Sequence, residues 1–178
     1  MKLAISYRTR DSVPLRYCLA LMVLLSGCSV KMVADYNAAG AQEIIRIAKV
    51  VDLFYGDLLE TRYEERSYDR FAEKYRSVEV DLRGLMFQNR IRPYNRESTR
   101  ISEIILDKWI KYKNRHKSQW EKYRLPEDSP DKIKASEIYK DVLVEKHRRR
   151  FQRLFIAIAI AEEAKKLAAS DVNEGDQE

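Results

Sequence analysis

His116 and His147 are the residues of this sequence best suited to acid–base or metal chemistry, because an imidazole titrates close to neutral pH. In a helical bundle, a di-iron site requires Glu-x-x-His on facing helices. Lys113 and Val144 stand three residues before the two histidines, so that motif is absent. The only two cysteines precede residue 29, which leaves a zinc site without thiolate ligands in the rest of the chain. We therefore predict two ordinary histidines at the rim of the core, with no metal or other cofactor.

Other catalytic patterns are also missing from the sequence. A nucleophilic Ser or Cys needs a histidine that a carboxylate orients, and the chain contains neither a Gly-x-Ser-x-Gly elbow nor a Gly-rich phosphate loop. The side chains of the adjacent carboxylates Glu64–Glu65 and Glu162–Glu163 point about 100° apart on a helix, so the two members of a pair cannot both act on the same substrate bond. We interpret both pairs as solvated surface. We predict that the protein is not an enzyme, with an enzyme of unfamiliar pattern as the alternative.

A run of basic residues near the C-terminal end is the strongest charge cluster. It comprises Lys146, Arg148, Arg149 and Arg150, followed by Arg153. Successive helical residues turn by about 100°, so the three adjacent arginines fan around a helix and cannot form one flat patch. Two interpretations stay open: a solvated surface, or a contact with anionic lipid head groups or an acidic protein partner. Near a membrane, each such charge contributes about 1 kcal/mol.

The N-terminal segment has three parts in a characteristic order. Residues 1–17 carry four basic side chains, and Cys18–Leu25 is an uninterrupted apolar run. This run is too short to cross a bilayer, which needs about 20 apolar residues. The small residues Ser26 and Gly27 follow it and precede Cys28. This order is typical of an export signal.

Leu25-Ser26-Gly27-Cys28 resembles the lipobox of bacterial lipoproteins. The resemblance implies that the Cys28 thiol receives a diacylglycerol, that the signal peptide is cut before this residue, and that the new amino group is acylated, as in N-palmitoyl cysteine. Two or three acyl chains hold a domain at a membrane almost permanently, at about 0.8 kcal/mol for each buried methylene. Because Ser29 stands where an aspartate favours inner-membrane retention, the resemblance implies the inner leaflet of the outer membrane, facing the periplasm.

The charge balance argues against nucleic acid as a partner. Half of the net charge of +6 lies before Cys28, and the rest of the chain carries 30 basic and 27 acidic side chains. Such a mixed-charge surface is not a strong phosphate-binding field. We expect two partners, the membrane through the lipid anchor and a protein of the cell envelope, and the sequence carries no indication of an oligomeric state. A basic helical nucleic-acid-binding protein is the alternative that requires the lipobox interpretation to be wrong.

The pattern of apolar residues predicts an all-α fold. Glycine and proline are few, and apolar residues recur at spacings of three and four. We expect an antiparallel bundle of three or four helices with a long C-terminal helix, after a cleaved signal peptide. The predicted organisation is a signal peptide at 1–27, a lipid-anchored tether at 28–37, a helical bundle domain at 38–169 and a disordered acidic tail at 170–178. The tether reaches about 30 Å at 3.3 Å per residue.

Breaks in this periodicity place the turns. We expect one turn near Glu64 to Ser67 and another at Pro93, with Asn95 or Ser98 capping the next helix. Ser129 and Pro130 together predict the start of the long last helix, because a serine cap and a proline at the first position suit a helix N-terminus. Several tyrosines near the apolar stripes are expected at an amphipathic rim, with a protein-binding face as the alternative: Tyr63, Tyr68, Tyr75, Tyr112, Tyr123 and Tyr139.

Overall fold

A computed structural model describes residues 33–174 of the chain. The lipobox, the signal peptide at 1–27 and the first five residues of the expected tether lie outside the described residues, as do residues 175–178. The predictions made for these segments therefore stay predictions.

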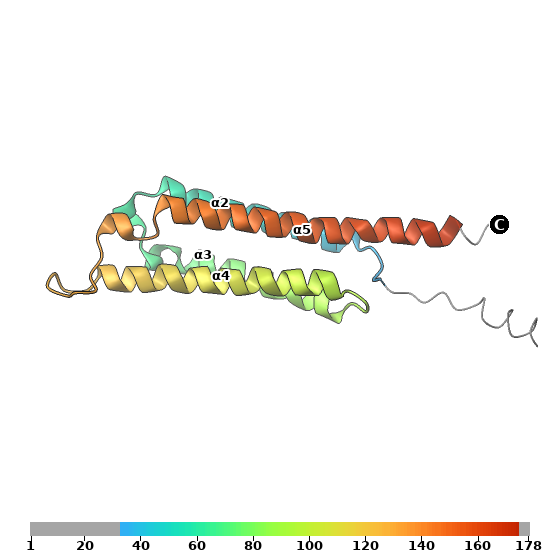
Figure 1. The fold of residues 1–178 in the computed structure, drawn as a ribbon, viewed down its shortest axis with the longest axis horizontal. Helices are drawn as coiled ribbons and strands as arrows, with labels where there is room; N and C mark the ends of the chain where they lie inside the picture. The colour runs from blue at the N-terminus through green and yellow to red at the C-terminus, as the bar shows by residue number, and fades with distance from the viewer. Residues whose placement is uncertain (1–32, 175–178) are drawn as a thin grey trace, which may run out of the picture. The chain divides into compact units, whose positions relative to one another are not determined.

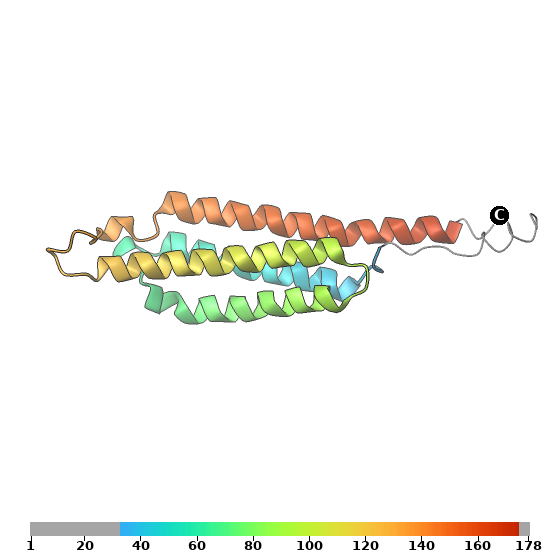
Figure 2. The same ribbon diagram turned by 60° about the horizontal axis from the view of Figure 1, so that its bottom comes forward.

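Four long helices and two short 3₁₀ turns account for the described part of the chain, in which no strand occurs. The elements are α2 (Ala38–Glu60), η1 (Tyr63–Glu65), α3 (Tyr68–Ile91), α4 (Arg96–Tyr123), η2 (Ala135–Glu137) and α5 (Asp141–Glu174). The predicted all-α class, with four helices of which the last is the longest, is confirmed. Consecutive helices run in opposite directions, and α2 and α4 each contact both α3 and α5 (Figures 1 and 2).

The break between α2 and α3 lies where the lapse in the apolar stripe predicts it. α2 ends at Glu60, and α3 begins after Ser67, whose hydroxyl oxygen accepts a hydrogen bond from the Arg70 N–H at 3.2 Å. This bond satisfies one of the N–H groups that a helix leaves unpaired at its first turn. Ser67 therefore fixes the first residue of α3.

Replacing this cap is expected to weaken the bundle modestly. Ser67→Ala removes the acceptor for the Arg70 N–H, and loss of such a cap costs about 1 kcal/mol. Urea unfolding followed by circular dichroism measures the loss. Ser77→Ala is the matched control, because Ser77 is an exposed residue inside α3 with no capping bond, and it should change stability by less than half as much. Equal effects of the two variants would contradict the assignment of Ser67 as the cap.

The predicted start of the last helix is wrong. α5 begins at Asp141, and the residues from Pro130 to Lys140 form turns and η2. Tyr139 has a φ of 47°, in the left-handed region, so a right-handed helix cannot pass through it. The Tyr139 carbonyl accepts a hydrogen bond from Nη1 of buried Arg66 at 3.0 Å. This long-range contact stabilises the left-handed conformation of Tyr139 immediately before α5. It therefore outweighs the local start signal of Ser129 and Pro130.

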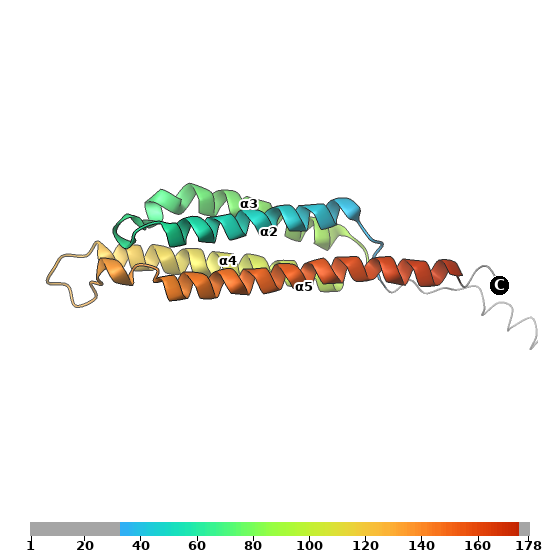
Figure 3. The same cartoon turned by 90° about the horizontal axis from the view of Figure 1, so that it is seen from above.

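The end of the last helix also differs from the expected one. α5 continues to Glu174, so residues 170–174 of the segment expected to be disordered are helical. No glycine or proline occurs between Asp141 and Glu174, and Gly175 is the first residue that disfavours a helix. Figure 3 shows that this C-terminal part of α5 extends past the first residue of α2.

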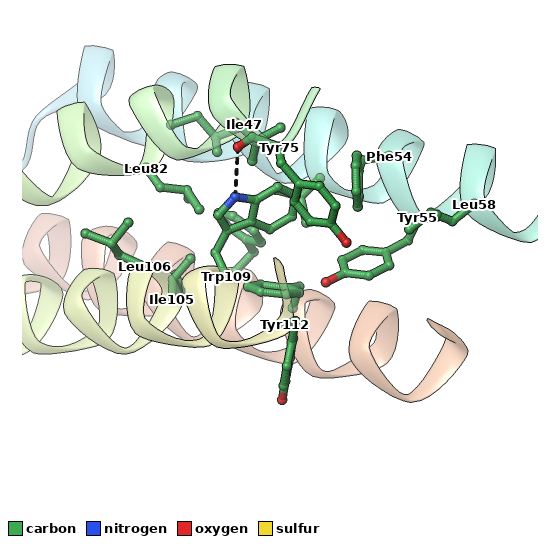
Figure 4. Packing of buried hydrophobic residues seen from close by; sticks show 14 of the residues in the cluster. Ile47, Phe54, Tyr55, Leu58, Tyr75, Leu82, Ile105, Leu106, Trp109 and Tyr112 are labelled. Carbon is green, nitrogen blue, oxygen red and sulfur yellow. Dashed lines mark hydrogen bonds between the residues drawn. The ribbon is translucent and has the colours of Figure 1, made fainter. Parts of the chain in front are cut away.

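Aromatic rings and aliphatic side chains pack together in the centre of the bundle (Figure 4). Trp109 of α4 is fully buried, and its indole Nε1–H donates to the Tyr75 carbonyl oxygen at 3.1 Å. Phe54 of α2 packs against Trp109 with ring centroids 5.0 Å apart. Tyr75, Tyr112 and Tyr139 are buried, so their predicted place at the rim is wrong. The hydroxyls of Tyr75 and Tyr139 are paired inside the core, and that of Tyr112 is paired with Arg150 at the edge of the core, which removes the usual penalty for burying a phenol.

Residues before α2 lie against the bundle. Ala34 is buried, the Asn37 N–H donates to Glu162 Oε1 at 3.0 Å, and Arg92 donates to the Asp35 carbonyl oxygen. The last residues of the expected tether are therefore part of the packed domain.

Candidate functional site

His116 lies in the core, so its predicted rim position is wrong. Its Nε2 is 2.9 Å from the Arg66 carbonyl oxygen, and its Nδ1 is 3.2 Å from the Tyr75 hydroxyl. A carbonyl oxygen only accepts, so Nε2 carries the proton and Nδ1 accepts from the tyrosine. Burial lowers the pKa of His116 to about 4, and the ring is neutral at pH 7. Its role in this structure is to pair buried polar groups.

His147 is buried as well, which corrects the second half of the same prediction. Its Nδ1 lies 2.8 Å from the Tyr139 hydroxyl, and its ring stacks on Tyr112 with centroids 3.4 Å apart and planes 3° from parallel. Burial first, and then neighbouring cations of α4 and α5, lower the pKa of His147 to about 3. Both residues of this stacked pair line a groove between α4 and α5.

The two carboxylate pairs have different surroundings. Glu64 and Glu65 are exposed as predicted, whereas Glu162 is fully buried and its neighbour Glu163 is exposed. The Glu162 carboxylate accepts hydrogen bonds from Arg92, at 2.9 and 3.2 Å, and from Lys165. Burial opposes the charged form, but these donors and the Asn37 N–H outweigh it and lower the pKa of Glu162. Glu162 is therefore a structural anion and not solvated surface.

Lys165 completes this buried ion cluster. Its Nζ donates to Asn95 Oδ1 at 2.6 Å and to Ser98 Oγ at 3.0 Å, in addition to Glu162. Burial lowers the pKa of Lys165, since desolvation disfavours the ammonium. Asn95 precedes α4, but its side chain does not cap the helix as predicted; it binds Lys165 and Asn89 instead. The cluster joins α5 to the α3–α4 turn.

The described residues show neither a metal site nor a membrane span. Between residues 33 and 174, no three His, Cys, Asp or Glu side chains gather closely enough to hold a metal ion. In the same range, no helix has the length and apolar character needed to cross a bilayer.

The three adjacent arginines of the basic run on α5 point in different directions, as the turn of about 100° for each helical residue predicts. Each contacts a different helix: α2, α5 itself or α4. Arg148 binds Asp52 of α2 through two hydrogen bonds of 2.8 and 2.7 Å. Arg149 pairs with Glu145 of its own helix at 2.8 Å. Arg150 Nη1 donates to the Tyr112 hydroxyl of α4 at 2.8 Å. The run therefore does not form one flat patch, as predicted, and a contact of Lys146, Arg148, Arg149, Arg150 and Arg153 with lipid or a protein partner stays a prediction.

Only Lys146 and Arg150 of this run line the groove between α4 and α5. Arg153 is exposed one turn beyond Arg150 and does not line this groove. Cations of α4, which the sequence analysis missed, face Lys146 and Arg150 across the groove. We call the whole surface the basic groove; it comprises Lys108, Lys111, Arg115, Lys122, Lys140, Lys146 and Arg150.

Two hollows lie in the basic groove. The larger has a volume of about 630 Å³ and includes Lys122, Lys140 and one carboxylate, Glu137. The smaller, which we call the small hollow, has a volume of about 180 Å³. Eight residues line the small hollow, and five of them are Lys or Arg while none is acidic. They are Lys108, Lys111, Tyr112, Arg115, Leu143, Lys146, His147 and Arg150.

The cations of the groove have few carboxylate partners. Among the described residues, Lys111, Arg115, Lys122 and Lys146 form no ion pair within 4.0 Å. Elsewhere on the bundle most exposed arginines are paired, as Arg46 is with Glu43 and Asp81. The basic groove is therefore a mainly positive surface, with Glu137 as the one carboxylate that lines it, within a chain of mixed charge.

A second, apolar groove lies between α2 and α5. It has a volume of about 710 Å³, and its side chains include Ile45, Leu53 and Ile156, which are 44%, 68% and 58% exposed. The ion pair between Asp52 and Arg148 borders this groove. It contains no buried polar group aimed at a ligand in the described part of the chain.

Comparison with known proteins identifies no relative: no family model matches the chain, and no curated protein or solved structure is significantly similar to it.

Proposed function

We propose that this chain is a bacterial envelope lipoprotein, anchored through Cys28, whose helical domain acts by binding as an adaptor or structural component of an envelope complex. We further propose that it faces the periplasm from the inner leaflet of the outer membrane. The observation that carries the binding role is the basic groove, in which four cations have no carboxylate partner among the described residues. Such a surface attracts anionic groups, which the head groups of a membrane present.

The positions of the titratable groups also favour binding over catalysis. Both histidines are neutral, buried and paired with groups of the core. Glu162, the carboxylate that the fold buries completely, is neutralised by Arg92 and Lys165. A general acid or base must reach a substrate, and Glu162 and His116 are turned inward, whereas His147 lines the small hollow with a ring whose pKa of about 3 makes it a weak base. The unpaired cations of the basic groove, by contrast, are available for contact with other molecules.

The lipid anchor is tested by labelling cells with a radioactive fatty acid. The wild-type protein is expected to carry the label, and Cys28→Ala is expected to lose it, because the thiol and the amino group of this residue are the proposed acylation sites. Cys18→Ala is the matched control and should keep the label, since Cys18 lies within the proposed signal peptide. Label that persists in Cys28→Ala would refute the lipoprotein proposal.

The binding role of the groove is tested without the anchor. A Cys28→Ser chain is mixed with isolated envelope membranes at low salt and sedimented, and we expect Lys111→Glu with Lys122→Glu to weaken its association at least tenfold. Arg76→Glu with Lys117→Glu makes the same charge change outside the groove and should have little effect. If both pairs weaken association equally, the groove is not the binding surface.

A further inference from the structure

We propose that the small hollow between α4 and α5 binds a phosphate group, in particular a phosphomonoester. This inference names the ligand chemistry of the basic groove and rests on the proposed binding function. A phosphomonoester is a compact anion with close to two negative charges and three acceptor oxygens.

The walls of the small hollow supply donors from both helices. Lys108, Lys111 and Arg115 recur at helical spacing on α4, and Lys146 and Arg150 lie one turn apart on α5. Their ammonium and guanidinium groups have donors and no acceptors. The volume of about 180 Å³ holds several groups the size of a water molecule, at about 30 Å³ each, and therefore a phosphate.

Two of the residues that line the small hollow, His147 and Tyr112, are held in place by contacts with each other and with the core. His147 stacks on Tyr112 and binds the Tyr139 hydroxyl through Nδ1, while its Nε2 has no hydrogen-bond partner among the described residues. The Tyr112 hydroxyl accepts from Arg150 Nη1 at 2.8 Å, which fixes one nitrogen of that guanidinium and leaves its other donors unused. A site whose donors are already fixed loses less entropy when an anion binds.

The charge of the small hollow selects a multiply charged anion. Lys108 pairs at 3.2 Å with Asp107, which is 70% exposed, so this cation is partly neutralised from outside. The four others line the hollow together with the neutral ring of His147, and no carboxylate is in the lining. After burial, the charges of three of them, Arg115, Arg150 and Lys146, contribute to the low pKa of His147. One carboxylate would offset a single positive charge, whereas a phosphomonoester offsets close to two and also presents paired oxygens that the guanidinium groups of Arg115 and Arg150 can bind.

A phosphomonoester can come from a free solute or from a lipid head group. The two sources are separated by probes added to the full Cys28→Ser chain: inorganic phosphate, followed by calorimetry, and phosphatidylcholine vesicles with or without phosphatidic acid, followed by sedimentation. Binding of inorganic phosphate indicates a soluble ligand. Binding confined to vesicles that contain phosphatidic acid indicates a membrane head group.

The assignment to the small hollow is tested by Arg115→Gln with Lys146→Gln. We expect this double substitution to weaken binding at least tenfold for whichever of the two probes the wild-type chain binds. The control double substitution, Arg76→Gln with Lys117→Gln, should leave that binding within twofold of the wild type. Lys111→Gln alone should give a smaller loss, and thermal unfolding checks that all variants fold. Equal losses in both pairs, or no binding of either probe by the wild-type chain, would overturn the proposal.

The outcomes also separate this proposal from the wider function. If the groove charges are needed for association with envelope membranes but neither phosphate nor phosphatidic acid binds, the basic groove binds another anion, such as an acidic protein, and only the phosphate inference fails. If Cys28→Ala keeps the fatty-acid label but phosphate still binds in the small hollow, only the lipoprotein proposal fails.

Discussion

Lowering the pH from 7 to 5 is expected to reduce the free energy of unfolding by about 4 kcal/mol, because His116 and His147 must stay neutral in the folded protein. Their folded-state pKa values are about 4 and about 3, against about 6.5 in an unfolded chain. Below pH 6.5 the two histidines are therefore protonated in the unfolded state but remain neutral in the folded state. The free energy of unfolding consequently falls as the pH falls. At about 1.36 kcal/mol for each pH unit below 6.5, each histidine contributes about 2 kcal/mol at pH 5.

Urea unfolding at pH 7 and at pH 5 measures this loss. The range ends at pH 5 because paired carboxylates such as Glu79, whose pKa is lowered, contribute mainly below it. His116→Gln is expected to be less stable at pH 7, since it disturbs the bonds to Arg66 and Tyr75, but its loss between pH 7 and pH 5 should be about half that of the wild type. An unchanged pH dependence in His116→Gln would contradict a buried neutral imidazole.

Local sequence patterns were sufficient for the fold class and for two of the three breaks. Spacings of three and four place Ile47, Phe54 and Leu82 on buried helix faces, and all three are buried. The turns before Tyr68 and at Pro93 follow from local features of the chain. Helical periodicity and proline chemistry act over a few residues, so their consequences can be read from one segment at a time.

The errors arose where distant residues determine the conformation. The start of α5 depends on Arg66, whose guanidinium binds the Tyr139 carbonyl and the Asp141 carboxylate 73 and 75 residues away. A serine and a proline at positions 129 and 130 carry a local start signal, but they cannot supply those bonds. The burial of His116 likewise requires the Arg66 carbonyl, 50 residues away. Rules that assign polar residues to the surface fail wherever the fold supplies a partner.

The basic groove could be predicted only in part, because the sequence shows the basic face of α4 but not the face of α5 that lies opposite it. Lys108, Lys111, Arg115 and Lys122 follow helical spacing on α4, so their shared face is visible in the sequence. Which face of α5 they oppose depends on the packing of the two helices. The same packing turns Arg148 toward Asp52 of α2, so the most basic stretch of the sequence contributes only part of its charge to the groove.

The second large effect is expected at the buried ion cluster, where Glu162→Met should lower the free energy of unfolding by about 3–5 kcal/mol. The substitution leaves the Lys165 ammonium buried beside Asn95 and Ser98 without its anion, and an uncompensated buried charge carries a penalty of this size. The Asn37 N–H also loses its acceptor, so its hydrogen exchange should become faster. Glu163→Met is the matched control and should cost less than about 1 kcal/mol, because Glu163 pairs with Lys166 at the surface.

Removing both charges tests whether the penalty comes from the unpaired lysine. Glu162→Met with Lys165→Met is expected to be more stable than Glu162→Met alone, because the desolvation of a buried pair largely offsets its mutual attraction. The side chain of Arg92 is 18% exposed, so water can solvate its charge once the carboxylate is gone. Arg92 therefore does not become an uncompensated buried charge as Lys165 does. Urea unfolding of the two single variants and the double variant completes the cycle. If the losses simply add, Glu162 stabilises the bundle through its own packing and hydrogen bonds, and Lys165 does not depend on it for its charge.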